Sequence, residues 1–535
     1  MKQYVLIPGR HHILSEFIHE YFDAIARSKT VQLADGRVVQ LDDDLMLVWA
    51  VTSANHSNTR RNPFPAHRRE AVIENFGRDI PAKSLVYHIP DIGQSERFAH
   101  FAINTIEVES RGQLRLTPEN CIIATSTPEV IAYFRSEGFT EFAPVELQST
   151  EPLTFVTERA WELAEILVKA GASWRLDNDY LTKVHPASKE MLTKYLLGDQ
   201  LIEIYSDPLG GTEGNITETR DYEVYRAAFD QGAERKYDLI KTHIVPGRIV
   251  DIGCATGSII KKMSFDERLR ESDIFGIEIA RPLYELCVQS KQNGTFGNDN
   301  VYFYQRNIMQ SKLFPDNSVQ TTTSFSLTHE VESYMGRDSL LKFITQIYEQ
   351  TAVGGTYINV DVIGPENGDS QVLMWLNSED GLDDDGRDTN HKNPKVYAEF
   401  LESLSTLGRF KRFVVDFRAE EHETVVHALF ESGGEWYAKL ELRDAADFME
   451  TKDYTQSWLS EMHERFCFWA LSDWKRELEA VGFVVDPSSH AYRNEWIVEN
   501  RFEGKVAIYE TNDENEPTVK LEFPVTSMVL VAHKM

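Results

Sequence analysis

The stretch "RIVDIGCATGSIIKKM", residues 248–263, decides the fold of the second half of this chain. Its first apolar letters predict a buried β-strand, and Asp251 stands near the strand's end. Gly253 and Gly257 then frame a tight turn, and a helical pattern of apolar residues follows. Such a turn directs backbone N–H groups and a helix N-terminus at a ligand. Taken alone it fits a dinucleotide, a phosphate or no ligand.

Outward from this turn, strand-like and helix-like segments alternate in two series. One series covers residues 1–150 and the other begins near residue 226. Alternation of this kind predicts parallel, doubly wound sheets, so we expect an α/β protein with two Rossmann-like domains. The predicted organisation is a first domain at 1–150, a connector at 151–225 and a second domain at 226–535. Within the second domain, residues of about 365–450 form an insertion or cap.

Length, charge and cysteine content narrow the functional classes. The chain has 535 residues, a formal net charge of −30 and four cysteines without zinc-ligand spacing. The length predicts more than one domain, and the cysteine pattern predicts a reducing compartment and no metal site. The acidic balance disfavours a polyanionic partner, so we expect no DNA and disfavour RNA. With no signal peptide and no long apolar run, we expect a cytoplasmic protein without a membrane partner; the oligomeric state does not follow.

The acidic residues around the glycine turn distinguish between ligands. Glu278 ends the next predicted strand, 21 residues after Gly257, where a carboxylate can accept hydrogen bonds from ribose hydroxyls. Asp251, just before the turn, suits the positively charged end of an amino acid. A pyrophosphate would instead need amide donors.

The pattern resembles the class I S-adenosylmethionine (SAM)-dependent methyltransferases. The resemblance implies a seven-stranded methyltransferase fold, SAM as cofactor and a transferase activity. It also implies the cofactor-binding residues, namely Asp251, Gly253, Cys254, Ala255, Gly257, Glu278, Asn307, Ile308 and Ser324.

The segment after the fourth predicted strand bears on the methyl acceptor. It contains "SLTHE", residues 326–330, and lacks the proline-aromatic motif of amino-directed DNA methyltransferases. His329 and Glu330 are the candidate catalytic residues, because an imidazole can take a proton near neutral pH. A histidine at a helix start is also often a capping or packing residue. The aromatic residues of "EMHERFCFWALSDW", residues 461–474, either line an acceptor pocket or belong to the core.

Two segments of the first domain suggest a second ligand. "IPGRHH" (7–12) follows the first strand and "TSANHSNTRRNPFPAHRRE" (52–70) follows the second. Together they resemble the HxGH-type nucleotidyltransferases, particularly the nicotinamide-mononucleotide adenylyltransferases, although His11 and His12 are adjacent and do not meet the catalytic spacing. The resemblance implies ATP or another nucleotide as a ligand. The implied nucleotide- or phosphate-binding residues are Gly9, Arg10, His11, His12, Arg60, Arg61, Arg68 and Arg69.

Three functions are compatible with these patterns. The leading hypothesis is a SAM-dependent methyltransferase that acts on a small-molecule acceptor, with a nucleotide-linked one as an option, fused to a nucleotidyltransferase-like domain. The protein would then be bifunctional if that domain were active. The alternatives are an RNA-modifying methyltransferase and a non-enzymatic nucleotide sensor.

Overall fold

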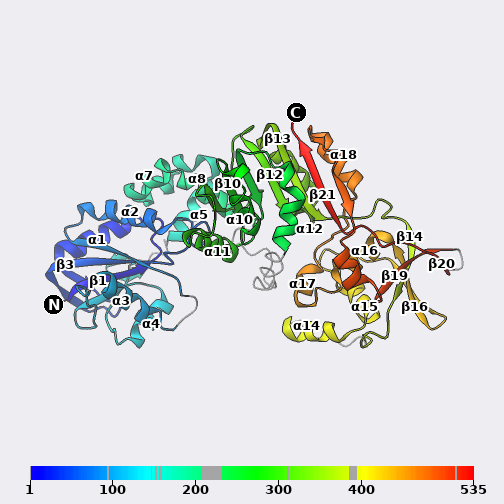
Figure 1. Cartoon of the computed structure of the whole chain (residues 1–535). Helices are drawn as coiled ribbons and strands as arrows, with labels where there is room; N and C mark the ends of the chain where they lie inside the picture. Colours follow the sequence, from blue (N-terminus) through cyan, green and yellow to red (C-terminus); the bar gives the residue numbers. More distant parts are fainter. Residues whose placement is uncertain are drawn as a thin grey trace. The chain divides into compact units, whose positions relative to one another are not determined.

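A computed structural model gives the secondary structure and sheet topology of the chain (Figure 1). It describes residues 2–92, 96–145, 147–150, 153–155, 160–207, 232–309, 312–384, 394–512 and 515–535. The chain divides into two compact units, Met1–Gly214 and Asn215–Met535. Within the described part of the chain, no helix combines the length and apolar character that a membrane crossing requires.

The unit Met1–Gly214 is built on a six-stranded sheet in which the first strand lies at the centre. Five strands are parallel in the order β4-β3-β1-β5-β6, and β2 pairs antiparallel with the start of β3. The strands are β1 (Lys2–Gly9), β2 (Thr30–Gln32), β3 (Val38–Thr52), β4 (Lys83–Ile89), β5 (Cys121–Ala124) and β6 (Phe142–Ala143). The chain moves outward from β1 in both directions, so the carboxyl ends of β1 and β5 flank a topological switch point, where such sheets bind ligands.

Helices cover both faces of this sheet. They are α1 (Glu16–Ser28), α2 (Ala66–Phe76), α3 (Phe98–Glu109) and α4 (Pro128–Ser136). Phe22 of α1 and Ile73 of α2 pack with Trp49 in one apolar core. Ile106 of α3 and Phe134 of α4 belong to the core on the other face. The predicted α/β class with a parallel sheet is therefore confirmed for this unit.

Much of the predicted connector, 151–225, is a helical layer of the first unit. Its helices are α5 (Ala160–Ala170), α6 (Asn178–Lys183), α7 (Pro186–Lys194) and α8 (Leu197–Ser206), after a small hairpin of β7 (Leu147–Thr150) and β8 (Leu153–Phe155). Leu167 and Trp174 share an apolar cluster with Ile13 and Phe64. Amphipathic helices need a partner for their apolar stripe, and the first unit supplies it. Residues 208–231 lie outside the described ranges.

The unit Asn215–Met535 contains an eight-stranded sheet. Its path is β11-β10-β9-β12-β13-β21-β17, and β18 also pairs with β21, which gives one strand more than the seven predicted. The strands are β9 (Arg248–Ile252), β10 (Asp273–Glu278), β11 (Val301–Gln305), β12 (Val319–Phe325), β13 (Thr351–Val362), β17 (Val484–Val485), β18 (His490–Tyr492) and β21 (Ser527–His533). Strands β9 to β13 are parallel and β21 runs antiparallel to β13. The switch point here lies between β9 and β12.

Helices again cover both faces. They are α10 (Ser258–Ser264), α11 (Arg281–Gln292), α12 (Thr328–Met335), α13 (Arg337–Gln350) and α18 (Leu471–Val481). Ile260 of α10 and Cys287 of α11 belong to one core cluster with Ile249 of β9. Phe343 of α13 and Trp474 of α18 belong to the cluster on the opposite face. This sandwich holds the ends of β9, β10 and β12 in register.

A second sheet in this unit was not anticipated. It is antiparallel, in the order β15-β16-β14-β19-β20. The strands are β14 (Gln371–Leu376), β15 (His427–Ser432), β16 (Glu435–Glu441), β19 (Val506–Thr511) and β20 (Pro517–Lys520), and the helices that accompany them are α14 (Pro394–Ser403), α15 (Thr406–Asp416), α16 (Leu442–Thr451), α17 (Trp458–Glu461) and α19 (Glu495–Ile497). The insertion predicted at 365–450 thus also includes β19 and β20, because β14 pairs with β19.

Candidate functional site

The loop between β9 and α10 has the backbone of the predicted glycine turn. Gly253, Ala255 and Gly257 have positive φ angles of 68°, 48° and 75°. A Cβ atom at Gly253 would lie 3.1 Å from Leu327, and one at Gly257 would lie 3.3 Å from Phe303. Both positions therefore need glycine for backbone and space. Ala255 is a non-glycine residue in the left-handed region, the kind of strain that concentrates at functional sites.

Backbone amides of this turn are engaged within the protein. The N–H groups of Gly253 and Cys254 donate to the carbonyl of Ile277 at 2.9 and 3.1 Å. The N–H of Ala255 donates to Glu278 Oε2 at 2.8 Å. These three donors hold the turn against β10. Carboxylates, more than this row of amides, are consequently available to a ligand.

Two of those carboxylates, Asp251 and Glu278, are buried at neighbouring strand ends, with 1% and 7% exposure. Burial raises the pKa of Glu278 to about 7, although the N–H of Ala280, 2.8 Å from Oε1, opposes this. Burial also raises the pKa of Asp251 to about 7, against a hydrogen bond from Thr323 Oγ1 at 2.7 Å and the charge of Lys236. A ligand that brings positive charge or hydroxyl donors would stabilise both ionised forms.

Lys236 is a site residue that the sequence analysis did not identify. Its Nζ lies 3.4 Å from Ser326 Oγ, at the end of β12. Burial lowers the pKa of Lys236 to about 8, and the charges of Asp361 and Asp251 oppose that shift. A lysine in a helix that precedes the sheet carries no motif. Only the packing of Ala233 and Tyr237 into the core reveals where it points.

The remaining predicted cofactor residues differ in their placement. Asn307 and Ile308 follow β11 as expected, and Asn307 Oδ1 accepts the N–H of Met309 at 2.9 Å. Ser324, in contrast, is fully buried within β12, and its hydroxyl is 3.0 Å from both Tyr357 Oη and Asn359 Oδ1. Its hydrogen bonds are internal to the sheet, so we remove Ser324 from the cofactor set.

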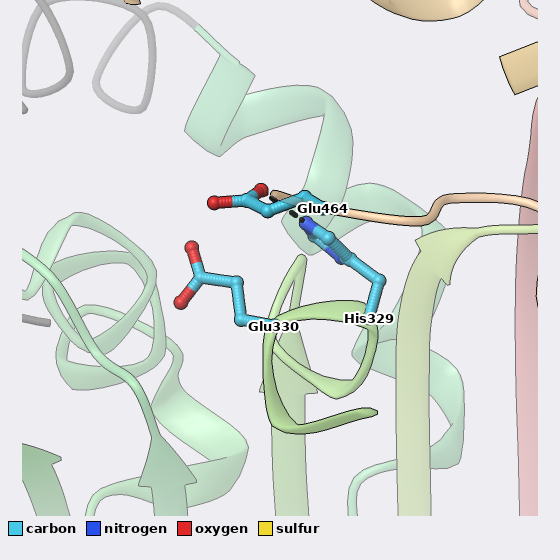
Figure 2. Close-up of side chains that lie close together, drawn as sticks. All are labelled: His329, Glu330 and Glu464. Atoms are coloured by element: carbon cyan, nitrogen blue, oxygen red, sulfur yellow. Dashed lines mark ion pairs between the residues drawn. The ribbon is translucent and has the colours of Figure 1, made fainter. Parts of the chain in front are cut away.

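The two predicted catalytic residues begin α12. Asp361 Oδ2 accepts the N–H of Thr328 at 2.7 Å, and Asp361 Oδ1 lies 2.6 Å from His329 Nδ1. The other ring nitrogen, Nε2, lies 3.4 Å from Glu464 Oε2. Glu330 is adjacent, and Figure 2 shows its carboxylate and that of Glu464 facing each other beside the imidazole. The structure thus combines the predicted pair with Asp361 and Glu464, which sequence reasoning missed.

The two carboxylates beside His329 favour the protonated form of its imidazole. Burial lowers its pKa, but Asp361 and Glu464 outweigh burial and hold the pKa well above the usual value. Conversely, burial raises the pKa of Asp361, but His329 and Thr328 bring it below the usual value. An acid within the strand "GGTYINVDVI", residues 354–363, was the available signal for Asp361. No local signal marked Glu464.

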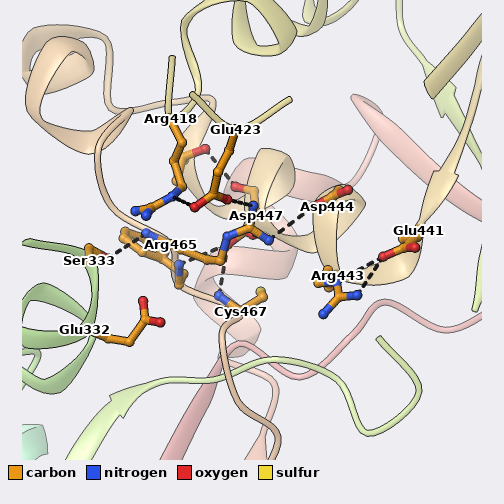
Figure 3. A network of polar contacts seen from close by, with 12 residues as sticks. Glu332, Ser333, Arg418, Glu423, Glu441, Arg443, Asp444, Asp447, Arg465 and Cys467 are labelled. Atoms are coloured by element: carbon orange, nitrogen blue, oxygen red, sulfur yellow. Dashed lines mark hydrogen bonds and ion pairs between the residues drawn. The ribbon is translucent and has the colours of Figure 1, made fainter. Parts of the chain in front are cut away.

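A polar network surrounds Arg465, the residue that follows Glu464 in the chain (Figure 3). The backbone N–H of Arg465 donates to Ser333 Oγ on α12 at 2.8 Å. Its guanidinium contacts Glu423 at 3.0 Å and Asp444 at 3.4 Å. Asp447 accepts the next two backbone N–H groups, at 3.0 and 2.9 Å. The segment that carries Glu464 is therefore tied to both α12 and α16.

Aromatic side chains near this segment have mixed roles. Phe466 packs edge-on against His329 with ring centroids 5.0 Å apart. Phe468 and Trp469 instead contact Trp474 in the core. His463 is turned toward Glu421, at 2.9 Å. Of the two interpretations of this aromatic segment, acceptor pocket or core, packing in the core describes most of it.

In the first unit, a cavity of about 510 Å³ opens at the switch point between β1 and β5. Gly9, Arg10, His11, His12 and Arg61 line it, together with Thr125, Ser126 and Thr127 at the start of α4. Burial lowers the pKa of His11 to about 4 and of His12 to about 3, so both rings are neutral at pH 7. The backbone of Ala160 lies near His12, but neither ring nitrogen has a hydrogen bond of normal geometry within the described ranges.

The arginine cluster predicted for phosphate binding does not assemble around the cavity. The Arg69 guanidinium donates to the carbonyls of Arg10, Thr52 and Ser53, at 3.1, 2.7 and 3.0 Å. Arg60 donates to two carbonyls at the end of α8, and Arg68 stacks on Tyr195. Arg60 and Arg69 therefore bind backbone carbonyls, and none of the three residues lines the cavity. Phosphate binding by these arginines stays a prediction.

Comparison with solved structures finds methyltransferases among the similar folds. The YcgJ protein from Bacillus subtilis has 12% identity and a TM-score of 0.29, covering 56% of this chain and 98% of that one. A SAM-dependent methyltransferase from Methanosarcina mazei has 13% identity and a TM-score of 0.28, with 55% and 97% coverage. One from Archaeoglobus fulgidus has 11% identity and a TM-score of 0.28, with 59% and 100% coverage. Such distant likeness carries no functional argument.

No protein-family model matches the chain, and the search of curated proteins finds no match. Inference about function consequently depends on the residues of the site.

Proposed function

We propose that the unit Asn215–Met535 is a SAM-dependent methyltransferase. The observation that carries the proposal is the glycine turn, whose amides donate to β10 and whose two buried acids, Asp251 and Glu278, remain available to a ligand. A dinucleotide would bring a pyrophosphate to the turn beside Asp251, and like-charge repulsion disfavours that arrangement. SAM brings a sulfonium, an ammonium and two ribose hydroxyls. Each Glu278 oxygen accepts one backbone N–H and has a further lone pair for a ribose hydroxyl.

Lys236 and Asp251 together suit the amino-acid end of SAM. Asp251 would face the ammonium group, and Lys236, which is close enough to shift its pKa, would face the carboxylate. One positive and one negative side chain complement the two opposite charges of a zwitterionic amino acid. This pairing is a second reason to prefer SAM to a nucleotide at this turn.

The proposed acceptor is a small molecule bound on the α12 side. The described side chains around His329 include the buried acids Glu330, Asp361, Glu450 and Glu464. Buried acids repel a polyanion, so an RNA acceptor is the weaker proposal. Methyl transfer is an in-line displacement on the sulfonium, and correct positioning supplies much of its acceleration. His329 and Glu330 would orient the acceptor.

The first test is a calorimetric titration of the full-length protein with S-adenosylhomocysteine. We expect one site with micromolar or tighter affinity, and no comparable binding of NAD. Tighter binding of NAD than of S-adenosylhomocysteine would refute the proposal. A steep loss of RNA affinity with added salt would instead favour the RNA alternative.

For the unit Met1–Gly214, we propose nucleotide or phosphate binding at the cavity between β1 and β5. Arg10 and Arg61 supply two positive charges there against the one negative charge of Glu129, and the start of α4 supplies helix N–H groups. His12 adds a buried neutral imidazole. Because His11 and His12 do not have the catalytic spacing, we propose that this unit binds a nucleotide without catalysing adenylyl transfer. In the full-length protein, this unit would recognise a nucleotide or a nucleotide-linked methyl acceptor. Titration with ATP and nicotinamide mononucleotide tests it; binding of neither would refute it.

A further inference from the structure

We propose that His329, Glu330 and Glu464 form a binding site for a divalent metal ion. One potential ligand atom from each residue lies within 4.8 Å of the others. His329 Nε2 and Glu464 Oε2 are 3.4 Å apart, and a metal ion bound between them would displace the Nε2 proton that the ion pair favours. Two ligand atoms that each bind an ion at about 2.0–2.2 Å lie roughly 3–3.5 Å apart when they are neighbours in its coordination shell. Small side-chain shifts would bring Glu330 to the same ion.

The groups behind these ligands have the arrangement that metal sites use. Asp361 Oδ1, 2.6 Å from His329 Nδ1, fixes the ring so that Nε2 faces Glu464. A carboxylate on the far nitrogen of a metal-binding histidine orients the ring and raises its basicity. Tyr334 Oη donates to Glu464 Oε1 at 3.0 Å and leaves Oε2 on the side of His329. These contacts are independent of the cluster and hold its ligand atoms in place.

The support of the three ligands is rigid. His329 and Glu330 are the second and third residues of α12, whose start Asp361 caps. The Arg465 network holds Glu464 against this helix. All three side chains are buried, with exposures of 5%, 7% and 1%. One imidazole and two carboxylates suit Mn²⁺ or a similar first-row ion, which accepts both nitrogen and oxygen ligands.

The use of such an ion rests on the proposed methyltransferase function. The cluster follows β12, beside the expected position of the SAM methyl group. A hydroxyl oxygen bound to the ion would lose its proton to solvent more readily, because a bound cation lowers the pKa of an oxygen ligand. The oxygen would then form a bond to the methyl carbon as the carbon–sulfur bond breaks, and the electron pair of that bond would leave on the neutral S-adenosylhomocysteine. The inferred acceptor class is therefore a hydroxyl compound.

The test is a Mn²⁺ titration of chelator-treated, full-length protein, with free Mn²⁺ measured by electron paramagnetic resonance. We expect one tight site in the unaltered protein. Glu464→Gln and His329→Gln should each weaken it by at least about tenfold, and Asp361→Asn by about 10–100-fold. Matched controls in the same segments, Glu461→Gln and His463→Gln, should leave the affinity unchanged.

The outcomes separate this proposal from the methyltransferase proposal. Each variant is also titrated with S-adenosylhomocysteine, and its folding is checked by thermal unfolding. No tight Mn²⁺, Mg²⁺ or Zn²⁺ site in the unaltered protein would overturn the metal site and leave an ion-paired histidine. Tight binding that survives both Glu464→Gln and His329→Gln would also overturn it. Metal binding without S-adenosylhomocysteine binding would support the site and reject the methyltransferase function.

Discussion

The two parallel sheets have candidate sites at equivalent topological positions but with opposite charge. In the first unit, the ends of β1 and β5 border a cavity lined by Arg10, Arg61 and a neutral His12. In the second, the ends of β9 and β12 border Asp251 and the acids near α12. The difference teaches that similar sheets place their candidate sites alike, and that the side chains at the strand ends determine the charge each site presents to a ligand. An anion suits the first site and a cationic cofactor suits the second.

Both sites also contain strained backbone. His11 and Ser53 follow β1 and β3 with φ of 50°, and Ala255 and Ser326 follow β9 and β12 with φ of 48° and 49°. Each is a non-glycine residue in the left-handed region. Such strain costs on the order of 1–3 kcal/mol and is stable only where surrounding contacts hold it. Variants of the residues that hold these strained segments therefore test how each site is supported.

The largest expected effect concerns Arg69, which supports the ends of β1 and β3 from within. Arg69→Met removes the donors of three carbonyls and should lower the local free energy of unfolding by about 3–5 kcal/mol. Native-state hydrogen exchange at amides of β1 and β3 measures this. Arg68→Met, which alters only a surface stacking contact, should change it by less than about 1 kcal/mol. Equal effects would mean that Arg69 is not the support.

The next effect tests the acid of the second site. Glu278→Ala should weaken S-adenosylhomocysteine binding by about 1.5–3 kcal/mol, because it removes a charged acceptor and a hydrogen bond to Ala255. Calorimetry measures the change. The control is Glu271→Ala, an exposed acid before β10 that should have no effect. Unchanged affinity in Glu278→Ala would reject the cofactor assignment.

A pH titration sharpens the contrast in charge. Asp251 and Glu278 have pKa values of about 7, so S-adenosylhomocysteine affinity should rise from pH 6 to pH 8 as they ionise, by up to about tenfold per unit for each group. Asp251→Asn should about halve the rise in log affinity, because Glu278 still titrates in this range. For the free energy of unfolding without ligand, the pH dependence has the opposite sign. The folded state then binds more protons than the unfolded chain between about pH 4 and 7, and these groups' contribution to stability falls across that range. A flat affinity profile in the unaltered protein would contradict the prediction.

The smallest effect concerns the first site. Arg61→Ala should weaken ATP binding by about 0.5–1 kcal/mol and reduce its salt dependence, because Arg61 is an exposed residue that lines the cavity. Arg60→Ala should leave the salt dependence unchanged, since its guanidinium binds carbonyls of α8's end. Isothermal titration at two salt concentrations distinguishes them. A larger salt effect from Arg60→Ala would support its predicted phosphate role.

The sequence by itself determined the local features of this protein. Strand–helix alternation predicted the two parallel sheets, and the spacing of Gly253, Gly257 and Glu278 predicted a turn beside an acid. These features are local, because a strand's period and a glycine's φ depend on residues close in the chain.

Only the tertiary structure decided which side chains share a site. Four arginines that lie near one another in the sequence do not form one cluster, because the guanidinium groups of Arg60 and Arg69 donate hydrogen bonds to backbone carbonyls. His329 acquires Asp361 from β13 and Glu464 from a distant segment, and the antiparallel sheet joins β14 to β19. Such pairings depend on which apolar faces and polar groups can be satisfied together in three dimensions. That condition acts between residues far apart in the chain, and no local pattern records it.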